Sequence, residues 1–191
     1  MSLTAGFEKG VNGNTITNAA AEGDATRWFT VTIVAGGTVA YDSTLAAKGN
    51  LSAKIATAGT SGTSLMRWDA SLTETFGRAY LYLTANPAAA ITPILLQTSG
   101  GGTVAQFQIL TTGKVRISDN AAHSQDSTAS IVLNQWIRVE YHVIASTTVG
   151  QIEAKLFNNP YSDVATEVVT SPSNWNTNTI ADLHKYGQTL N

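Results

Sequence analysis

The sequence predicts an all-β protein, a two-sheet antiparallel β-sandwich, and three observations point to this class. Apolar and polar residues alternate along many short segments, as in 131–143, where Ile137 and Val139 share one parity and Arg138 and Glu140 the other. A period of two is that of a strand with one buried face. Turns rich in Gly, Asn and Pro separate the segments. No segment has a helical pattern longer than one or two turns.

The expected strands follow one another along the chain, each between turn signals and most of them rich in β-branched or aromatic residues. In order they are WFTVTIV (28–34), GTVAYDS (37–43), LSAKIA (51–56), SLMRWD (64–69), GRAYLYL (77–83), ILLQT (94–98), VAQFQIL (104–110), GKVRISD (113–119), a strand within IVLNQWIRVEYHV (131–143), GQIEAKLF (150–157), TEVVT (166–170) and IADLHKYG (180–187). The glycines in 99–103 and 111–113 predict two tight turns between neighbouring strands.

Composition predicts one domain, residues 1–191, because 191 residues with 43% hydrophobic content can bury a single substantial core. Charged residues make up 13%, about half the usual share, as in extracellular or virion proteins. The net charge of -2 gives no field that would attract nucleic acid or anionic lipid. There is no cysteine for a disulfide framework, and no apolar run approaches the length of a membrane span.

The order of these segments resembles a concanavalin A-like (laminin G-like) jelly roll. The resemblance is carried by FEKG (7–10), YDSTLAAKGNLSAKI (41–55), GRAYLYL (77–83), FQILTTGKVRISD (107–119), LNQWIRVEYHV (133–143) and QIEAKLF (151–157). More narrowly, it is similar to the jelly rolls of tail- and capsid-associated proteins from actinobacteriophages. The family implies two stacked antiparallel sheets, of which the concave one often binds glycans.

The resemblance also implies a final strand, near Phe7 and Glu8, that this sequence ends too soon to contain. We therefore expect either that the natural chain continues or that a neighbouring chain completes the sheet edge by strand addition. The expected partners are copies of this chain or other virion proteins, and the expected location is virion or extracellular.

Three residues of 77–83 make a candidate carbohydrate-binding surface. Arg78, Tyr80 and Tyr82 share one parity, so a guanidinium and two phenol rings line the same face of one strand. Aromatic rings beside planar hydrogen-bond donors suit a sugar. The alternative is that the tyrosines pack beneath loops with only their hydroxyls in water.

Two tryptophans receive different interpretations. Trp136 opens a strand and is expected to anchor the packing. Trp175 lies in the polar loop SPSNWNTNT and is expected to be the most exposed tryptophan, a candidate contact for a protein partner. The alternative for Trp175 is that it covers the end of the core.

The sequence offers no catalytic motif, and we expect a protein that is not an enzyme. Laminarinase-type glucanases share the jelly roll and carry Glu-x-Asp-x-x-Glu on one strand, where the carboxylates serve as acid and nucleophile. The nearest match here, Glu22-Gly-Asp-Ala-Thr-Arg27, has arginine in the last position. The three histidines have no zinc-binding spacing, and Glu140, His142 and Glu153 are expected to be solvated strand residues.

No cofactor is expected; calcium is the one metal with candidate ligands. Asp119, Asn120 and Asp126 flank one loop and Asp42 and Asn50 another, as in calcium sites of jelly rolls. The same residues commonly bond the backbone of their own turns.

Together these observations favour a non-catalytic bacteriophage virion structural protein, either a capsid decoration or a minor tail subunit, that presents a lectin-like domain. The alternative is a carbohydrate-binding module that recognises a host cell-surface glycan. A glycanase is the third hypothesis.

Overall fold

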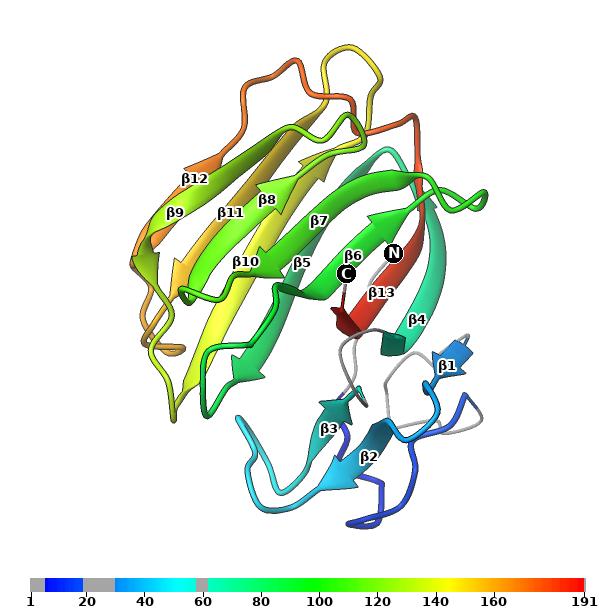
Figure 1. Ribbon diagram of the computed structural model, residues 1–191, viewed down its shortest axis with the longest axis vertical. Helices are drawn as coiled ribbons and strands as arrows, with labels where there is room; N and C mark the ends of the chain where they lie inside the picture. The colour runs from blue at the N-terminus through cyan, green and yellow to red at the C-terminus, as the bar shows by residue number, and fades with distance from the viewer. Residues whose placement is uncertain (1–5, 19–29, 58–61, 191) are drawn as a thin grey trace. The chain divides into compact units, whose positions relative to one another are not determined.

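The structure, a computed structural model, describes residues 6–18, 30–57 and 62–190. Within these residues it contains strands and no helix (Figure 1). The strands are β1 (Thr30–Thr32), β2 (Thr38–Asp42), β3 (Ser52–Ala56), β4 (Gly62–Leu72), β5 (Glu74–Tyr82), β6 (Ile91–Gln97), β7 (Thr103–Ile109), β8 (Lys114–Ser118), β9 (Ser124–Ser130), β10 (Trp136–Ile144), β11 (Gln151–Phe157), β12 (Glu167–Thr170) and β13 (Ala181–Leu190).

The described residues form two compact units. The first consists of the described parts of Met1–Asp69 and Lys185–Asn191, and the second is Ala70–His184. Strands β4 and β13 contribute residues to both units. The candidate binding residues Arg78, Tyr80 and Tyr82 all lie in the second.

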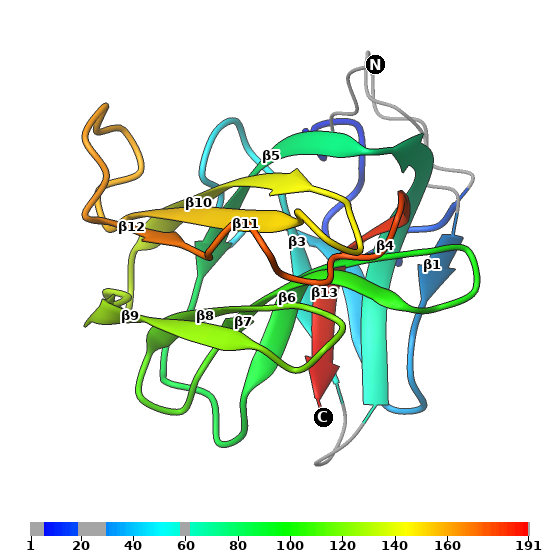
Figure 2. The same ribbon diagram turned by 90° about the horizontal axis from the view of Figure 1, so that it is seen from above.

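The second unit is a sandwich of two antiparallel sheets. One sheet has the order β12-β11-β10-β5, and the other has β6-β7-β8-β9, with the first residues of β13 next to β6. Figure 2 shows the two sheets as stacked layers. The rings of Phe107 on β7 and Tyr141 on β10 meet with centroids 4.9 Å apart, so these side chains lie between the layers. The antiparallel sandwich predicted from alternation is confirmed.

Alternation decides which side chains fill this interior. On β10 the residues Ile137, Val139, Tyr141 and Val143 are all at most 4% exposed, as the period of two predicts. Facing them from the other sheet are buried residues of one parity on β7 and β8, among them Phe107, Ile109, Val115 and Ile117. The opposite face of β5 and β10 therefore points away from the core.

Glu167 joins the two sheets at one edge. Its carboxylate accepts hydrogen bonds from the backbone N–H groups of Thr128 (2.8 Å) and Ala129 (2.6 Å) on β9. Burial raises the pKa of this carboxyl, but these backbone donors outweigh burial and hold the pKa below its ordinary value. The carboxylate thus satisfies edge donors that would otherwise be open to another strand.

The first unit has a smaller core between short strands. Strands β2 and β3 form a hairpin, β1 pairs with β4, and the end of β13 lies beside β4. One cluster of buried apolar residues there consists of Ile16, Val39, Tyr41, Met66 and Trp68. Glu8 caps the turn before β3, because its carboxylate accepts from Asn50 N (2.8 Å) and Leu51 N (3.1 Å).

Local predictions differ in outcome. The two glycine turns are confirmed: Gly101 and Gly113 have φ of 87° and 78° and close the β6–β7 and β7–β8 hairpins. Strand β9 was not predicted, because it is almost entirely polar. Strand β5 begins at Glu74, three residues before the predicted start.

No helix among the described residues is long and apolar enough to cross a membrane.

Candidate functional site

The outward face of β5 and β10 carries a concentration of aromatic and charged side chains, which we call the β5–β10 face. On β5, Thr75 is buried and a side chain at Gly77 would collide with the ring of Tyr141, so this parity points inward. The other parity points outward. The members of the face are Glu74, Phe76, Arg78, Tyr80 and Tyr82 on β5 and Trp136, Arg138, Glu140 and His142 on β10.

The register of the two strands pairs these residues across the sheet. Tyr82 lies opposite Trp136 and Tyr80 opposite Arg138. One step further, Arg78 lies opposite Glu140. Directly opposed side chains on one face are in contact distance in an antiparallel pair.

Aromatic rings stand at one end of the face. The rings of Tyr82 and Trp136 meet edge to face, with centroids 5.6 Å apart and planes at 66°. Both residues, and Tyr80 beside them, are half-buried. Each therefore keeps part of its surface in water while its neighbours limit its movement.

A fixed guanidinium lies next to these rings. Arg78 donates from Nε to Glu140 Oε1 at 2.7 Å, and its Nη2 is also 2.7 Å from that oxygen. The Arg78 side chain remains 55% exposed. An exposed ion pair of this kind adds little stability, so its main effect is to orient a planar donor on the surface.

Arg138 is not available to a ligand, although it belongs to the same strand face. It is 8% exposed and donates to the carbonyl oxygens of Pro160 and Ser162, both at 2.7 Å. Its guanidinium also covers the ring of Phe157 at 3.8 Å. These contacts fix the loop between β11 and β12 beside the face. Figure 2 shows this loop standing out from the end of its sheet, and Tyr161 on the loop is exposed.

The structure brings the three predicted residues Arg78, Tyr80 and Tyr82 together on one outward face. It adds Trp136, which the sequence analysis interpreted as a packing anchor, because its parity places it opposite Tyr82 and half in solvent. It also adds Phe76, which is 70% exposed. Phe76 shares the parity of Arg78, so a strand prediction begun at Glu74 would have found it.

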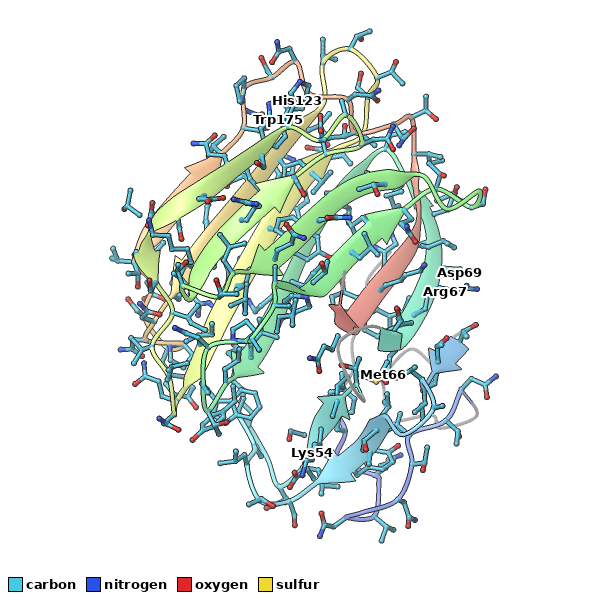
Figure 3. The ribbon with its side chains drawn as sticks, viewed as in Figure 1. Lys54, Met66, Arg67, Asp69, His123 and Trp175 are labelled. Carbon is cyan, nitrogen blue, oxygen red and sulfur yellow. The ribbon has the colours of Figure 1, made fainter. Side chains whose placement is uncertain are left out.

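The prediction that Trp175 is exposed is wrong. The side chain is 6% exposed and covers the end of the core. The main chain of Trp175 forms a β-bridge with Gly150, in which Trp175 N donates to Gly150 O at 3.0 Å. The ring of His123 stacks on the indole of Trp175, with ring centroids 5.7 Å apart. Figure 3 shows His123 and Trp175 together at one end of the strands.

The predicted calcium ligands have other partners. Asp119 accepts hydrogen bonds from the backbone of Ala121, His123 and Asn176. Asp126 pairs with Arg116 at 2.6 Å, and Asp42 accepts from Thr44 N. Within residues 6–18, 30–57 and 62–190 no three His, Cys, Asp or Glu side chains are grouped as metal ligands.

Of the carboxylates considered for catalysis, the structure describes Glu140 and Glu153, and each has an ion-pair partner. The segment from Glu22 to Arg27 lies outside the described residues. Glu140 binds Arg78, and Glu153 lies 3.4 Å from Lys155, so both act as partners in surface ion pairs. His142 lies opposite Phe76 and contacts Glu74, so it acts as a cross-strand partner.

The first unit contains a second group of charged side chains, which the sequence analysis did not identify. Arg67 and Asp69 on β4 form an ion pair at 2.7 Å and lie next to each other in Figure 3. Both charges act on the amine of Lys185 on β13. Burial is the main cause that lowers the pKa of this amine, and the charge of Arg67 lowers it further, whereas the charge of Asp69 raises it. A lysine with a lowered pKa is a candidate proton acceptor.

The fold is similar to that of a polysaccharide-cleaving enzyme. The crystal structure of endo-β-1,4-glucuronan lyase from the fungus Trichoderma reesei matches with a TM-score of 0.62 and 13% sequence identity, over 86% of this chain and 80% of the lyase. The chain has a concanavalin A-like jelly-roll fold. The sequence itself matches no family model, and no curated protein is significantly similar to it.

This comparison corrects the predicted function. A non-catalytic virion structural protein that is not an enzyme was the expectation from the sequence, whereas the solved structure to which this fold is similar is that of a glucuronan lyase. The comparison favours the carbohydrate-related hypotheses instead. At 13% identity it establishes the fold alone, so the site must be argued from this chain's own residues.

Proposed function

We propose that this chain binds a carbohydrate polymer through the β5–β10 face. The observation that carries the proposal is the gathering of Tyr80, Tyr82 and Trp136 beside the exposed guanidinium of Arg78 on one outward sheet face. Sugar rings present C–H faces that pack against aromatic planes and hydroxyls that need oriented donors. The similar fold of a polysaccharide lyase supports the same class of ligand.

Replacing Tyr82 by alanine tests this proposal. The substitution removes the ring that meets Trp136 and should weaken binding by about tenfold or more, as truncating an aromatic anchor does at other interfaces. We would titrate the wild type and Tyr82→Ala with β-1,4-glucuronan, with its carboxyl-reduced form and with bacterial cell-wall polysaccharide. Calorimetry or affinity electrophoresis gives the dissociation constants.

Val168→Ala is the matched control. Val168 lies on β12 opposite Lys155, is 49% exposed, and is separated from the β5–β10 face by β11. Its substitution should leave both binding and melting temperature unchanged. If the wild type bound none of the three polysaccharides, or if Tyr82→Ala bound as tightly as the wild type, carbohydrate binding at this face would be excluded.

Polysaccharide cleavage is a second candidate, favoured by the group of Arg67, Asp69 and Lys185 in the first unit. In an elimination on a uronate, a base takes the proton from the carbon next to the carboxylate, and the bond from the adjacent ring carbon to the glycosidic oxygen breaks to leave a carbon–carbon double bond. The departing oxygen takes up a proton from water. An amine with a lowered pKa suits the base, and a guanidinium suits the carboxylate. The fold shared with a glucuronan lyase supports this candidate.

Cleavage predicts an ultraviolet signal from the unsaturated product when the protein is incubated with β-1,4-glucuronan. The rate should rise as the pH rises through the pKa of Lys185, because only the neutral amine accepts a proton, and Lys185→Met should abolish it. Lys48→Met, in a turn of the same unit, serves as a control and should not change the rate. A wild type that produced no signal at any pH would exclude this activity.

We also propose that the protein is extracellular or part of a virion and that it self-associates. An extracellular or virion location would give the face access to cell-surface glycans. Self-association would multiply weak sites into avidity. Light scattering of the purified chain measures its oligomeric state.

A further inference from the structure

Phe76 is the most exposed aromatic side chain on either sheet. It is 70% exposed, and its ring stacks on that of His142 with centroids 4.1 Å apart and planes at 4°. His142 is held in turn by a 2.8 Å contact between its Nε2 and Glu74 Oε1. The result is a rigid, flat aromatic surface with one open face, and burying that face under an apolar group would be favourable.

This surface lies in line with the Tyr82–Trp136 pair. Phe76 and Tyr82 are six residues apart on β5, and His142 and Trp136 are six apart on β10. At about 3.3 Å per residue the two aromatic surfaces are roughly 20 Å apart, which corresponds to roughly four sugars of an extended chain. Because six is an even number, both lie on the same face of the sheet.

Polar groups occupy the space between the two aromatic surfaces. Arg78 and Glu140 form their ion pair there, and Tyr80 lies next along β5. The sequence of groups along the strands is therefore aromatic, charged, aromatic. An extended polysaccharide presents C–H faces and hydroxyl or carboxylate groups in turn along its length, and so matches this order.

We propose that the Phe76–His142 stack is a second sugar-binding platform, and that with Tyr82–Trp136 it forms one linear site for about four consecutive residues of an extended polysaccharide. The inference rests on the carbohydrate-binding function proposed above and adds the size and shape of the ligand. A single sugar reaches one platform, whereas a chain that spans both gains the contacts of the second without a second loss of translational freedom.

The length dependence of binding tests this inference. Wild type, Phe76→Ala and Tyr82→Ala would be titrated calorimetrically with β-1,4-glucuronan oligosaccharides of two to eight residues and with the carboxyl-reduced series. Wild-type affinity should rise by about tenfold or more between the shortest oligosaccharides and those of about four to six residues, then level off. Phe76→Ala should remove that rise, so that its affinity no longer increases with the length of the oligosaccharide.

Stability and specificity controls keep the outcomes distinct. Phe76 is exposed, so Phe76→Ala should melt like the wild type, and Val168→Ala should show the full length dependence. If Phe76→Ala retained the wild-type affinity for long oligosaccharides while Tyr82→Ala lost it, the second platform would be refuted and the proposed function would stand. If the wild type bound no oligosaccharide of any length, the linear site would be refuted, and the proposed function would be refuted with it if the wild type also bound none of the three polysaccharides. A wild-type affinity that did not change from two to eight residues would also refute the linear site.

Discussion

Trp175→Ala should lower the free energy of unfolding by about 3 to 5 kcal/mol, the cost of removing a large buried aromatic side chain. The indole is 6% exposed, and the main chain around it is closely fitted. Gly150 lies so close to the main chain of Trp175 that an added Cβ would collide with Trp175 O and with Thr177 Oγ1. Urea denaturation followed by circular dichroism measures the loss.

Tyr161→Ala is the matched control for this measurement. Tyr161 is also an aromatic residue in a polar loop, but it is 65% exposed, so its removal should change stability by no more than about 0.5 kcal/mol. Had Trp175 been the exposed partner contact expected from its sequence context, the two variants would behave alike. Equal stabilities of Trp175→Ala and the wild type would contradict the buried position.

The sequence predicted those parts of the fold where one face of a strand meets the core. Alternation is visible in β10 and β11 because half of their side chains are buried and half are not. Strand β9 has the sequence SQDSTAS and buries only Ser127, so no apolar periodicity marks it. It is a strand because its backbone pairs with the preceding strand β8 and its N–H groups donate to Glu167, which is far from it in sequence.

The candidate site was predictable to the extent that parity defines it. Arg78, Tyr80 and Tyr82 share one face on any straight strand, and the structure places them so. Trp136 joined them only through the register between β5 and β10, which are more than fifty residues apart in sequence. Trp175 was misjudged because the residues around it are polar, although the side chain itself is directed into the core.

Arg138 is a second residue that is buried although it belongs to the polar parity of its strand. By parity it belongs with Glu140 and His142 on the outward face, and the sequence places it in solvent. The loop that follows β11 covers it, so the residue is 8% exposed and its guanidinium donates to the carbonyl oxygens of Pro160 and Ser162. Contacts over more than twenty residues of separation leave no local pattern in the sequence.

Arg138→Met should therefore destabilise the protein by about 2 to 4 kcal/mol. The substitution leaves two carbonyl oxygens without their hydrogen-bond donor and removes the charge that stacks on Phe157. Arg138→Lys should restore little of this, since one ammonium cannot replace a planar fork that reaches two acceptors. The loop between β11 and β12 should also become sensitive to proteolysis under native conditions. Chemical denaturation and limited digestion measure the two effects.

Arg78→Met is the control that separates burial from charge. Both arginines contact Glu140 Oε1, with Arg78 Nη2 at 2.7 Å and Arg138 Nε at 3.2 Å, but the Arg78 side chain is 55% exposed and that of Arg138 10%. An exposed ion pair contributes about 0 to 1 kcal/mol, so Arg78→Met should leave stability and the loop nearly unchanged while it weakens polysaccharide binding. Equal losses of stability in the two variants would mean that Arg138 acts only through Glu140. A loss confined to Arg138→Met would mean that one arginine holds the loop while the other remains available to a ligand.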